Sequence, residues 1–171
     1  MTDKLTHQER LKGILQEDKA SPRSAAKEND ADEGEESCVA FGYLRGIRDH
    51  ATAVELRFRD GNSAWFPYGW LGPWRYNPSE GLLLKFSGDM IYLVLIRGSN
   101  LDMPLNDGSI NLTTGGLQRQ RVMWIQEMSE ADIKTVGEKG PTIDSIRVAE
   151  LESQAAVKAW IASNAPAFAA N

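Results

Sequence analysis

Residues that could carry out acid–base or metal chemistry are few in this 171-residue chain. The only histidines are His7 and His50. Asp49 precedes His50 and could orient its imidazole, but no nucleophile motif such as Gly-x-Ser-x-Gly accompanies the pair, so a surface histidine is the simpler interpretation. Two histidines without suitably spaced carboxylates or cysteines do not make a metal site. We therefore expect neither an enzyme nor a bound metal or other cofactor.

Phosphate-binding motifs are also missing from the sequence. It contains neither a P-loop of the type Gly-x-x-x-x-Gly-Lys nor the dinucleotide fingerprint Gly-x-Gly-x-x-Gly. The run Thr113-Thr114-Gly115-Gly116 could present backbone N–H groups to an anion, or it could form a plain turn. The sequence thus favours binding over catalysis.

Aromatic and arginine residues are the better candidates for a binding site. Six aromatic residues fall within one short stretch that also contains Arg75: Trp65, Phe66, Tyr68, Trp70, Trp74 and Tyr76. Proteins that bind single-stranded nucleic acid stack bases on exposed aromatic side chains beside arginine. Alternatively, these rings pack under C-terminal elements or at a subunit contact. In a strand, Trp65 and Phe66 must face opposite sides. If the aromatic residues on one side fill the barrel, those on the other side are either exposed or covered by Trp124 and the C-terminal helix.

Charge is distributed unevenly along the chain, whose net charge is −5. Residues 1–37 carry ten acids and six bases, whereas residues 38–127 carry eight acids and nine bases, all arginine except Lys85. Arginine suits planar contacts with anions, which would fit nucleic acid. The alternative is ion pairing at strand edges with Glu55, Asp60 and Asp89.

The cysteine and hydropathy patterns favour a cytoplasmic protein. Cys38 is the only cysteine, so no intrachain disulfide can form. The N-terminus lacks the apolar core of a signal peptide. The longest apolar run, Met90–Ile96, is too short to span a bilayer, so we expect no membrane partner.

Turn signals and alternation predict a first group of short strands. Cys38–Leu44 is apolar, and its Gly42 indicates a bulge or close packing. Thr52–Arg59 alternates between apolar and charged residues, which is typical of a half-buried strand. Asp60-Gly61 then predicts a hairpin to Asn62–Tyr68. Pro67 cannot donate to a strand ladder, so it marks an edge, a bulge or the end of that strand.

A second hairpin is predicted further along the chain. Asn77–Gly81 has the composition of a tight turn. Leu82–Ser87 and Met90–Arg97 follow as strands, and the second is nearly all apolar, which predicts burial on both faces. Short strands at this spacing favour a small antiparallel barrel.

The C-terminal part is expected to cover this barrel. Asp102–Gly116 predicts a packed loop or a broken helix, and Leu117–Glu127 ends in a strand-like run. A helix start at Ser129 and a strand over Pro141–Ala149 follow. Glu150–Asn164 is the strongest helix, and its apolar side would be lined by Leu151, Ala155, Ala159 and either Trp160 or Ile161. Residues 165–171 should fray.

This pattern predicts three parts. Residues 1–37 form a flexible acidic segment with room for a short helix over Met1–Asp18. Residues 38–149 form the small β-barrel domain with its covering segment. Residues 150–171 form the C-terminal helix and tail. The predicted fold class is mainly β.

One run resembles a known family. Leu95-Ile96-Arg97-Gly98-Ser99-Asn100-Leu101 resembles the second motif of the Sm-like (LSm) proteins, and the Asp60-Gly61 hairpin is similar to the opening half of their first motif. The resemblance implies an SH3-like or Sm-like barrel in a ring oligomer with an RNA-binding pore. Arg97 would contact a base and Gly98 would form the close turn. Trp65 and Phe66 stand where that family has a glycine.

The expected function is a non-catalytic binding module for RNA or other single-stranded nucleic acid. Its expected contacts are Arg97, Gly98, Asn100, Arg75, Trp74 and Tyr76. The alternative is a protein–protein interaction or homo-oligomeric assembly module, joined through strand edges and exposed aromatics. The sequence also resembles bacterial small-barrel proteins of uncharacterised activity, which implies no specific function.

Overall fold

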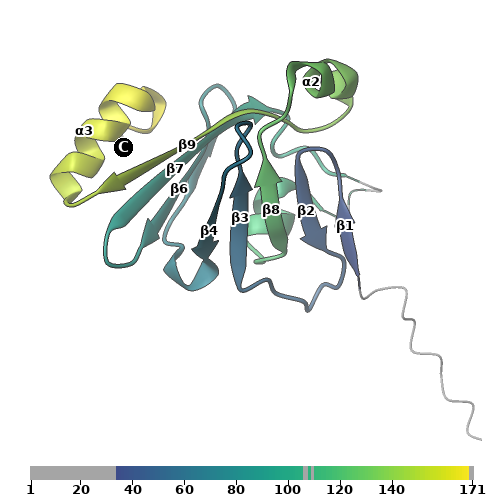
Figure 1. Ribbon diagram of the computed structural model, residues 1–171, viewed down its shortest axis with the longest axis horizontal. Coiled ribbons are helices and arrows are strands. Elements are labelled where there is room, and N and C mark those ends of the chain that lie inside the picture. The colour runs from purple at the N-terminus through teal and green to yellow at the C-terminus, as the bar shows by residue number, and fades with distance from the viewer. Residues whose placement is uncertain (1–33, 106–107, 109, 170–171) are drawn as a thin grey trace, which may run out of the picture. The chain divides into compact units, whose positions relative to one another are not determined.

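The computed structural model describes residues 34–105, 108 and 110–169, and expectations for residues 1–33 lie outside this part of the chain (Figure 1). The described strands form two sheets. Sheet A has the order β1-β2-β8-β3-β4 and sheet B the order β5-β6-β7-β9. Within the described part of the chain no helix is long and apolar enough to cross a membrane.

Sheet A combines the N-terminal strands with one from late in the sequence. Its members are β1 (Glu35–Ser37), β2 (Phe41–Leu44), β3 (Ala53–Arg57), β4 (Ser63–Pro67) and β8 (Val122–Gln126). All neighbours are antiparallel except β3 and β8, which run parallel. β1 lies before Cys38, where the domain was expected to begin, so the last residues of the expected flexible segment belong to sheet A instead. The predicted hairpin over Asp60-Gly61 is confirmed, and Pro67 ends the edge strand β4.

Sheet B is antiparallel throughout. It contains β5 (Arg75–Asn77), β6 (Gly81–Ser87), β7 (Ile91–Ser99) and β9 (Thr142–Leu151). β7 lies between β6 and β9, and its residues 93–96 are buried, as the apolar run predicts. The turn predicted at Asn77–Gly81 joins β5 to β6 and includes a hydrogen bond from Glu80 N to Asn77 O at 3.1 Å.

The helical segments among the described residues are short. They are η1 (Tyr68–Trp70), η3 (Leu112–Leu117), α2 (Glu130–Val136), η4 (Gly137–Lys139), α3 (Gln154–Asn164) and η5 (Pro166–Phe168). The helix start predicted at Ser129 is confirmed, because its side chain accepts a hydrogen bond from Asp132 N. In η3, Asn111 Oδ1 accepts from Gly115 N at 2.8 Å, so one N–H group of the Thr113–Gly116 run is bonded within the protein.

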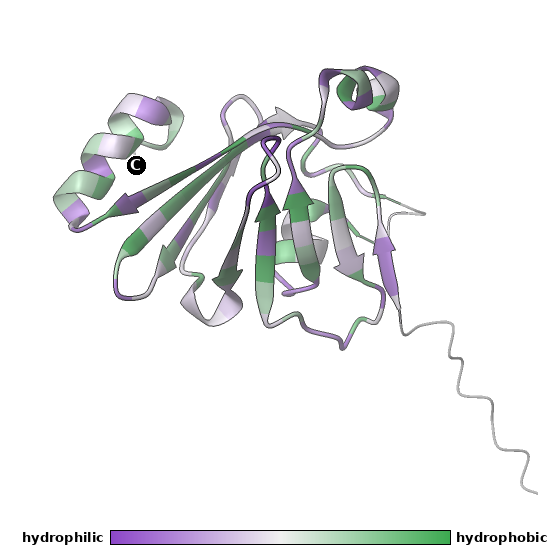
Figure 2. Ribbon diagram, in the orientation of Figure 1, coloured by the Kyte–Doolittle hydropathy of each residue, from purple (hydrophilic) through white to green (hydrophobic). Residues whose placement is uncertain are grey.

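The main core lies between the inward faces of the two sheets. Sheet A contributes Val54, Leu56 and Phe66, and sheet B contributes residues such as Leu84 and Phe86. The rings of Phe66 and Phe86 stack with centroids 4.7 Å apart, which joins the sheets directly. Figure 2 shows bands of apolar and polar residues along β3, as expected for a strand with one buried face.

A second core lies on the other face of sheet B. Leu83, Leu93 and Leu95 pack there against Val157 of α3 and Phe168 of η5. Figure 1 shows α3 beside sheet B on the side away from sheet A. Sheet B is therefore covered on both faces.

One expectation for the C-terminal segment is confirmed in part, and another is wrong. Trp160 and Ile161 of α3 pack against the second core, as does Leu151 at the end of β9. Ala155 and Ala159 are exposed, and Val157 is the buried residue of α3. The chain after the helix does not fray through residue 169: Phe168 is only 5% exposed because its ring enters the second core. Burial of one aromatic side chain thus orders a tail that composition alone would leave loose.

The coarse prediction of fold class is confirmed: the domain is mainly β and has a C-terminal helix. The two sheets share no strand, and the described strands do not close into a barrel. The SH3-like or Sm-like barrel is therefore unconfirmed.

Candidate functional site

Arg97, the arginine expected to contact a base, lies on the face of sheet B that α3 covers. Its guanidinium forms an ion pair with Glu80 and donates a hydrogen bond to Asn164 O at 2.7 Å. Its side chain remains about one-third exposed, at 35%. Because Asn164 is the last residue of α3, Arg97 ties that helix to β7.

Gly98 and Asn100 have backbone roles at the end of β7. A Cβ atom on Gly98 would lie 1.9 Å from Thr142 O, and the register with β9 shifts at this point. Only glycine fits so close to the neighbouring backbone. Asn100 adopts a left-handed conformation (φ 57°), and its amide donates to Gly140 O at 3.2 Å. The turn after β7 therefore centres on Asn100, two residues past Gly98.

The remaining expected contacts point in different directions. Arg75 Nη1 donates to Phe168 O at 2.7 Å, so its side chain lies with Arg97 on the face that the C-terminal segment covers. Trp74 and Tyr76 instead pack against the main core. The Tyr76 hydroxyl donates to Asp102 at 3.1 Å, and burial together with that carboxylate raises the pKa of Tyr76. The six expected residues thus do not form one surface.

An aromatic surface does exist on the outer face of sheet A. We call it the aromatic face and define it by Glu55, Arg57, Trp65 and Trp124. Glu55 pairs with Trp65 across the β3–β4 hairpin and with Trp124 across the parallel β3–β8 pair. The two indoles therefore flank Glu55 in one row that crosses three strands. Trp65 is 63% exposed, whereas its neighbour Phe66 is buried in the core.

Gly42 extends this row to β2. It pairs with Trp124, and a Cβ atom there would lie 2.2 Å from the indole Nε1. The register also shifts between Gly42 and Tyr43. Both predicted meanings of this glycine, a bulge and close packing, are therefore confirmed.

Arg57 links the charges and rings of the aromatic face. Its Nε donates to Glu55 at 2.8 Å, and its guanidinium carbon lies 4.4 Å from the centroid of the Trp124 ring. The hydrogen bond from Arg57 is the main cause that lowers the pKa of Glu55 below its ordinary value. Glu55 is therefore ionised at neutral pH, and Arg57 is held over the ring of Trp124.

A hollow of about 570 Å³ lies over this face. Its lining includes Trp65, Trp124, Arg57 and His50. A ring nitrogen of His50 donates to Arg119 O at 3.0 Å, which brings the loop before β3 next to the turn before β8. His50 is exposed, whereas His7 lies outside the described residues. The site offers stacking surfaces and hydrogen-bonding groups.

Part of this site could be predicted from the sequence. Alternation along Thr52–Arg59 places Glu55 and Arg57 opposite the buried residues, and the Asp60-Gly61 turn places Trp65 near them. The partnership with Trp124 could not be predicted, because it depends on pairing between β3 and β8, which are distant in the sequence.

The described residues contain no group of three or more histidine, cysteine, aspartate or glutamate side chains placed to hold a metal ion. Comparisons with protein families, with curated proteins and with solved structures find no match.

Proposed function

We propose that this domain is a non-catalytic binding module and that its aromatic face binds single-stranded nucleic acid. The observation that carries the proposal is the row of Trp65 and Trp124 on an exposed sheet face, with Arg57 stacked on one indole. Flat side chains on a sheet surface give unpaired bases a place to stack.

Stacking would supply most of the affinity. A base placed on Trp65 covers an indole that is otherwise in water, and such stacking contributes about 1–3 kcal/mol per base. Arg119 lies next to His50, which donates to its carbonyl, and it forms no ion pair among the described residues. Its side chain is therefore available to a phosphate.

Electrostatics should have a smaller part. Glu35 and Glu55 line the same hollow as Arg57, so the lining has no excess of positive charge. Few counterions would be released on binding, and the dependence of affinity on salt should therefore be shallow. This favours single strands over duplex DNA, whose recognition relies more on phosphate contacts.

The resemblance to Sm-like proteins supports the same function through another residue, Arg97. That proposal needs Arg97 to exchange its bonds to Glu80 and Asn164 for contacts with a base. The two sites lie on the outer faces of different sheets, so single substitutions can distinguish them.

Fluorescence anisotropy with labelled oligo(U) and oligo(dT) tests the proposal. Trp65→Ala should weaken binding by about 5- to 150-fold, the range that corresponds to one lost stacking contact. Trp70→Ala is the matched control, because Trp70 is 41% exposed but lies outside the aromatic face. If Arg97→Ala weakens binding and Trp65→Ala does not, the Sm-like site is favoured. If the wild type binds neither oligonucleotide, the proposed function is wrong.

A second candidate function is homo-oligomeric assembly, the alternative that the sequence left open. The observation that favours it is the position of Trp65 on β4, an edge strand of sheet A. An exposed tryptophan beside an unpaired strand edge suits contact with another protein or a second copy.

A further inference from the structure

We propose that the pocket between sheet B and the C-terminal segment binds a small amphipathic anion, an acid group carried on an apolar body. The pocket has a volume of about 540 Å³, within the range of about 300–1,000 Å³ that is typical of small-molecule sites. It lies on the outer face of sheet B, so it is separate from the aromatic face of sheet A. The proposal does not depend on nucleic-acid binding.

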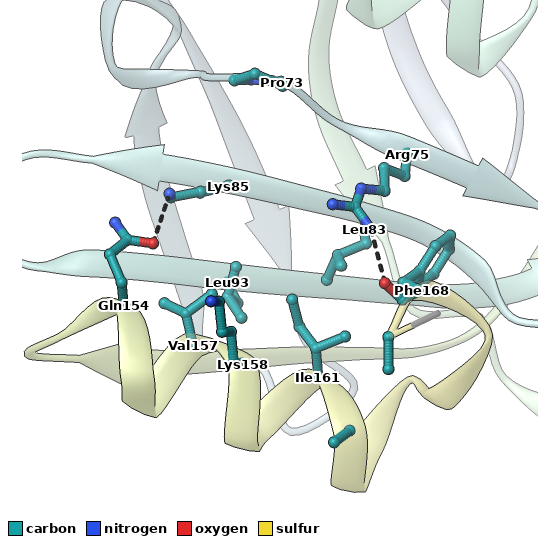
Figure 3. A pocket seen from close by; sticks show the side chains of 12 residues that line it. Pro73, Arg75, Leu83, Lys85, Leu93, Gln154, Val157, Lys158, Ile161 and Phe168 are labelled. Atoms are coloured by element: carbon teal, nitrogen blue, oxygen red, sulfur yellow. Dashed lines mark hydrogen bonds between the residues drawn. The ribbon is translucent and has the colours of Figure 1, made fainter. Parts of the chain in front are cut away.

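Apolar side chains from three elements form the walls of this pocket. Leu83 and Leu93 project from neighbouring strands of sheet B, Val157 and Ile161 come from α3, and Phe168 closes one end (Figure 3). Ser153 caps the start of α3, because its side chain accepts a hydrogen bond from Ala156 N. Arg97 holds the end of the helix to sheet B through Asn164 O, and Arg75 holds the segment after it through Phe168 O. The walls are therefore fixed before a ligand enters.

Three cations surround this apolar lining. Arg75 comes from β5, Lys85 from β6 and Lys158 from α3 (Figure 3). The lining contains no aspartate or glutamate, and none of the three cations forms an ion pair among the described residues. Two of them donate hydrogen bonds to neutral groups. Arg75 donates to the Phe168 carbonyl, and Lys85 donates to Gln154 Oε1 at a distance of 3.4 Å. The positive charge is therefore not compensated locally.

This combination selects one ligand chemistry. Positive charge beside apolar walls attracts anions more strongly than it would in open water, and it repels cations. An anion without an apolar part would leave the exposed and half-buried apolar side chains of the lining, Pro73, Ile161 and Ala162, in contact with water. A carboxylate or phosphate on an alkyl or aryl body satisfies both parts, with its acid group near Lys85 and Lys158.

Isothermal titration calorimetry with decanoate, below its micelle concentration, tests this inference. We expect one decanoate per chain, similar binding of decyl phosphate, and no measurable binding of acetate at the same concentration. Decyltrimethylammonium, which has the same chain and the opposite charge, should bind at least about tenfold more weakly. Preference for decyl phosphate over decanoate would identify the headgroup as phosphate.

Two variants locate the site. Ala162→Trp places an indole in the pocket from an exposed position on α3 and should abolish binding, whereas its neighbour Ser163→Trp should not. Lys85→Gln with Lys158→Gln should weaken binding by about tenfold or more, and Lys134→Gln with Lys139→Gln is the charge-matched control.

The outcomes separate cleanly. Equal binding by Ala162→Trp and Ser163→Trp, equal binding of the cationic and anionic detergents, or no binding of decanoate would each overturn the inference. Binding of oligonucleotides by Ala162→Trp should match that of the wild type, so failure of this site and failure of the aromatic face are distinguishable.

Discussion

At the scale of single residues, arginine side chains in this domain join segments that are far apart in the sequence by donating to backbone carbonyls. The acceptors are Met128 and Asp144 for Arg59, Phe168 for Arg75, Asn164 for Arg97, and Leu44 and Arg45 for Arg121. A guanidinium suits this role because its several N–H groups lie in one plane. Of the expected strand-edge ion pairs, that of Glu55 is present, with Arg57.

Arg121 should be the most important of these arginines for stability. It is only 5% exposed and donates to Leu44 O at 2.9 Å and to Arg45 O at 2.5 Å. Arg121→Met should lower the free energy of unfolding by about 2–4 kcal/mol, because it removes both hydrogen bonds that this buried side chain donates to the carbonyls of Leu44 and Arg45. Urea denaturation measures the loss. Arg119→Met, at an exposed position nearby, should change stability by less than about 0.5 kcal/mol; equal losses in the two variants would contradict this role.

At the scale of elements, β9 is the strand where the two sheets are tied together. The Glu127 carboxylate, just after β8, accepts from Arg59 N at 2.7 Å and from Ile146 N at 2.6 Å. The Arg59 side chain adds a bond to Asp144 O at 3.0 Å. These two side chains satisfy backbone groups of β9 on the side that does not face β7.

Removal of this tie should loosen β9 locally. In Glu127→Gln, one carboxylate oxygen is replaced by an amide nitrogen, which cannot accept a hydrogen bond. We expect a loss of about 1–3 kcal/mol in unfolding free energy, together with faster hydrogen exchange at the Ile146 amide. Glu138→Gln is the control, since Glu138 is exposed on η4. Unchanged protection of Ile146 would show that Glu127 does not hold the strand.

At the scale of the whole molecule, sheet B separates two cores, one shared with sheet A and one shared with the C-terminal segment. The aromatic face lies on the outer face of sheet A, and the anion pocket lies beside the second core on the outer face of sheet B. Each site can therefore be altered from exposed positions with little effect on the main core.

The oligomeric state decides between the two candidate functions. If the aromatic face serves nucleic acid, light scattering without oligonucleotide should give the mass of one chain, 18.9 kDa, at high concentration. If the wild type instead has a multiple of that mass and the Trp65→Ala variant has the mass of one chain, assembly through β4 would be favoured. A ring-sized oligomer insensitive to Trp65 would instead support the Sm-like proposal.

The sequence alone determined the local features of this fold. Alternation and Asp60-Gly61 predict the β3–β4 hairpin, the apolar run predicts the buried β7, and Gly42 predicts its bulge. These features depend on side-chain periodicity and on turn geometry, which neighbouring residues specify.

Only the tertiary structure decided how these parts combine. The placement of β8 beside β3, the burial of Phe168 and the engagement of Arg75 and Arg97 by carbonyls all join residues that are distant in the sequence. Every residue has a backbone carbonyl, so the sequence does not show which carbonyl a given arginine side chain will bond to. For that reason the motif around Arg97 suggested a binding residue, whereas in the folded chain its guanidinium holds the end of α3.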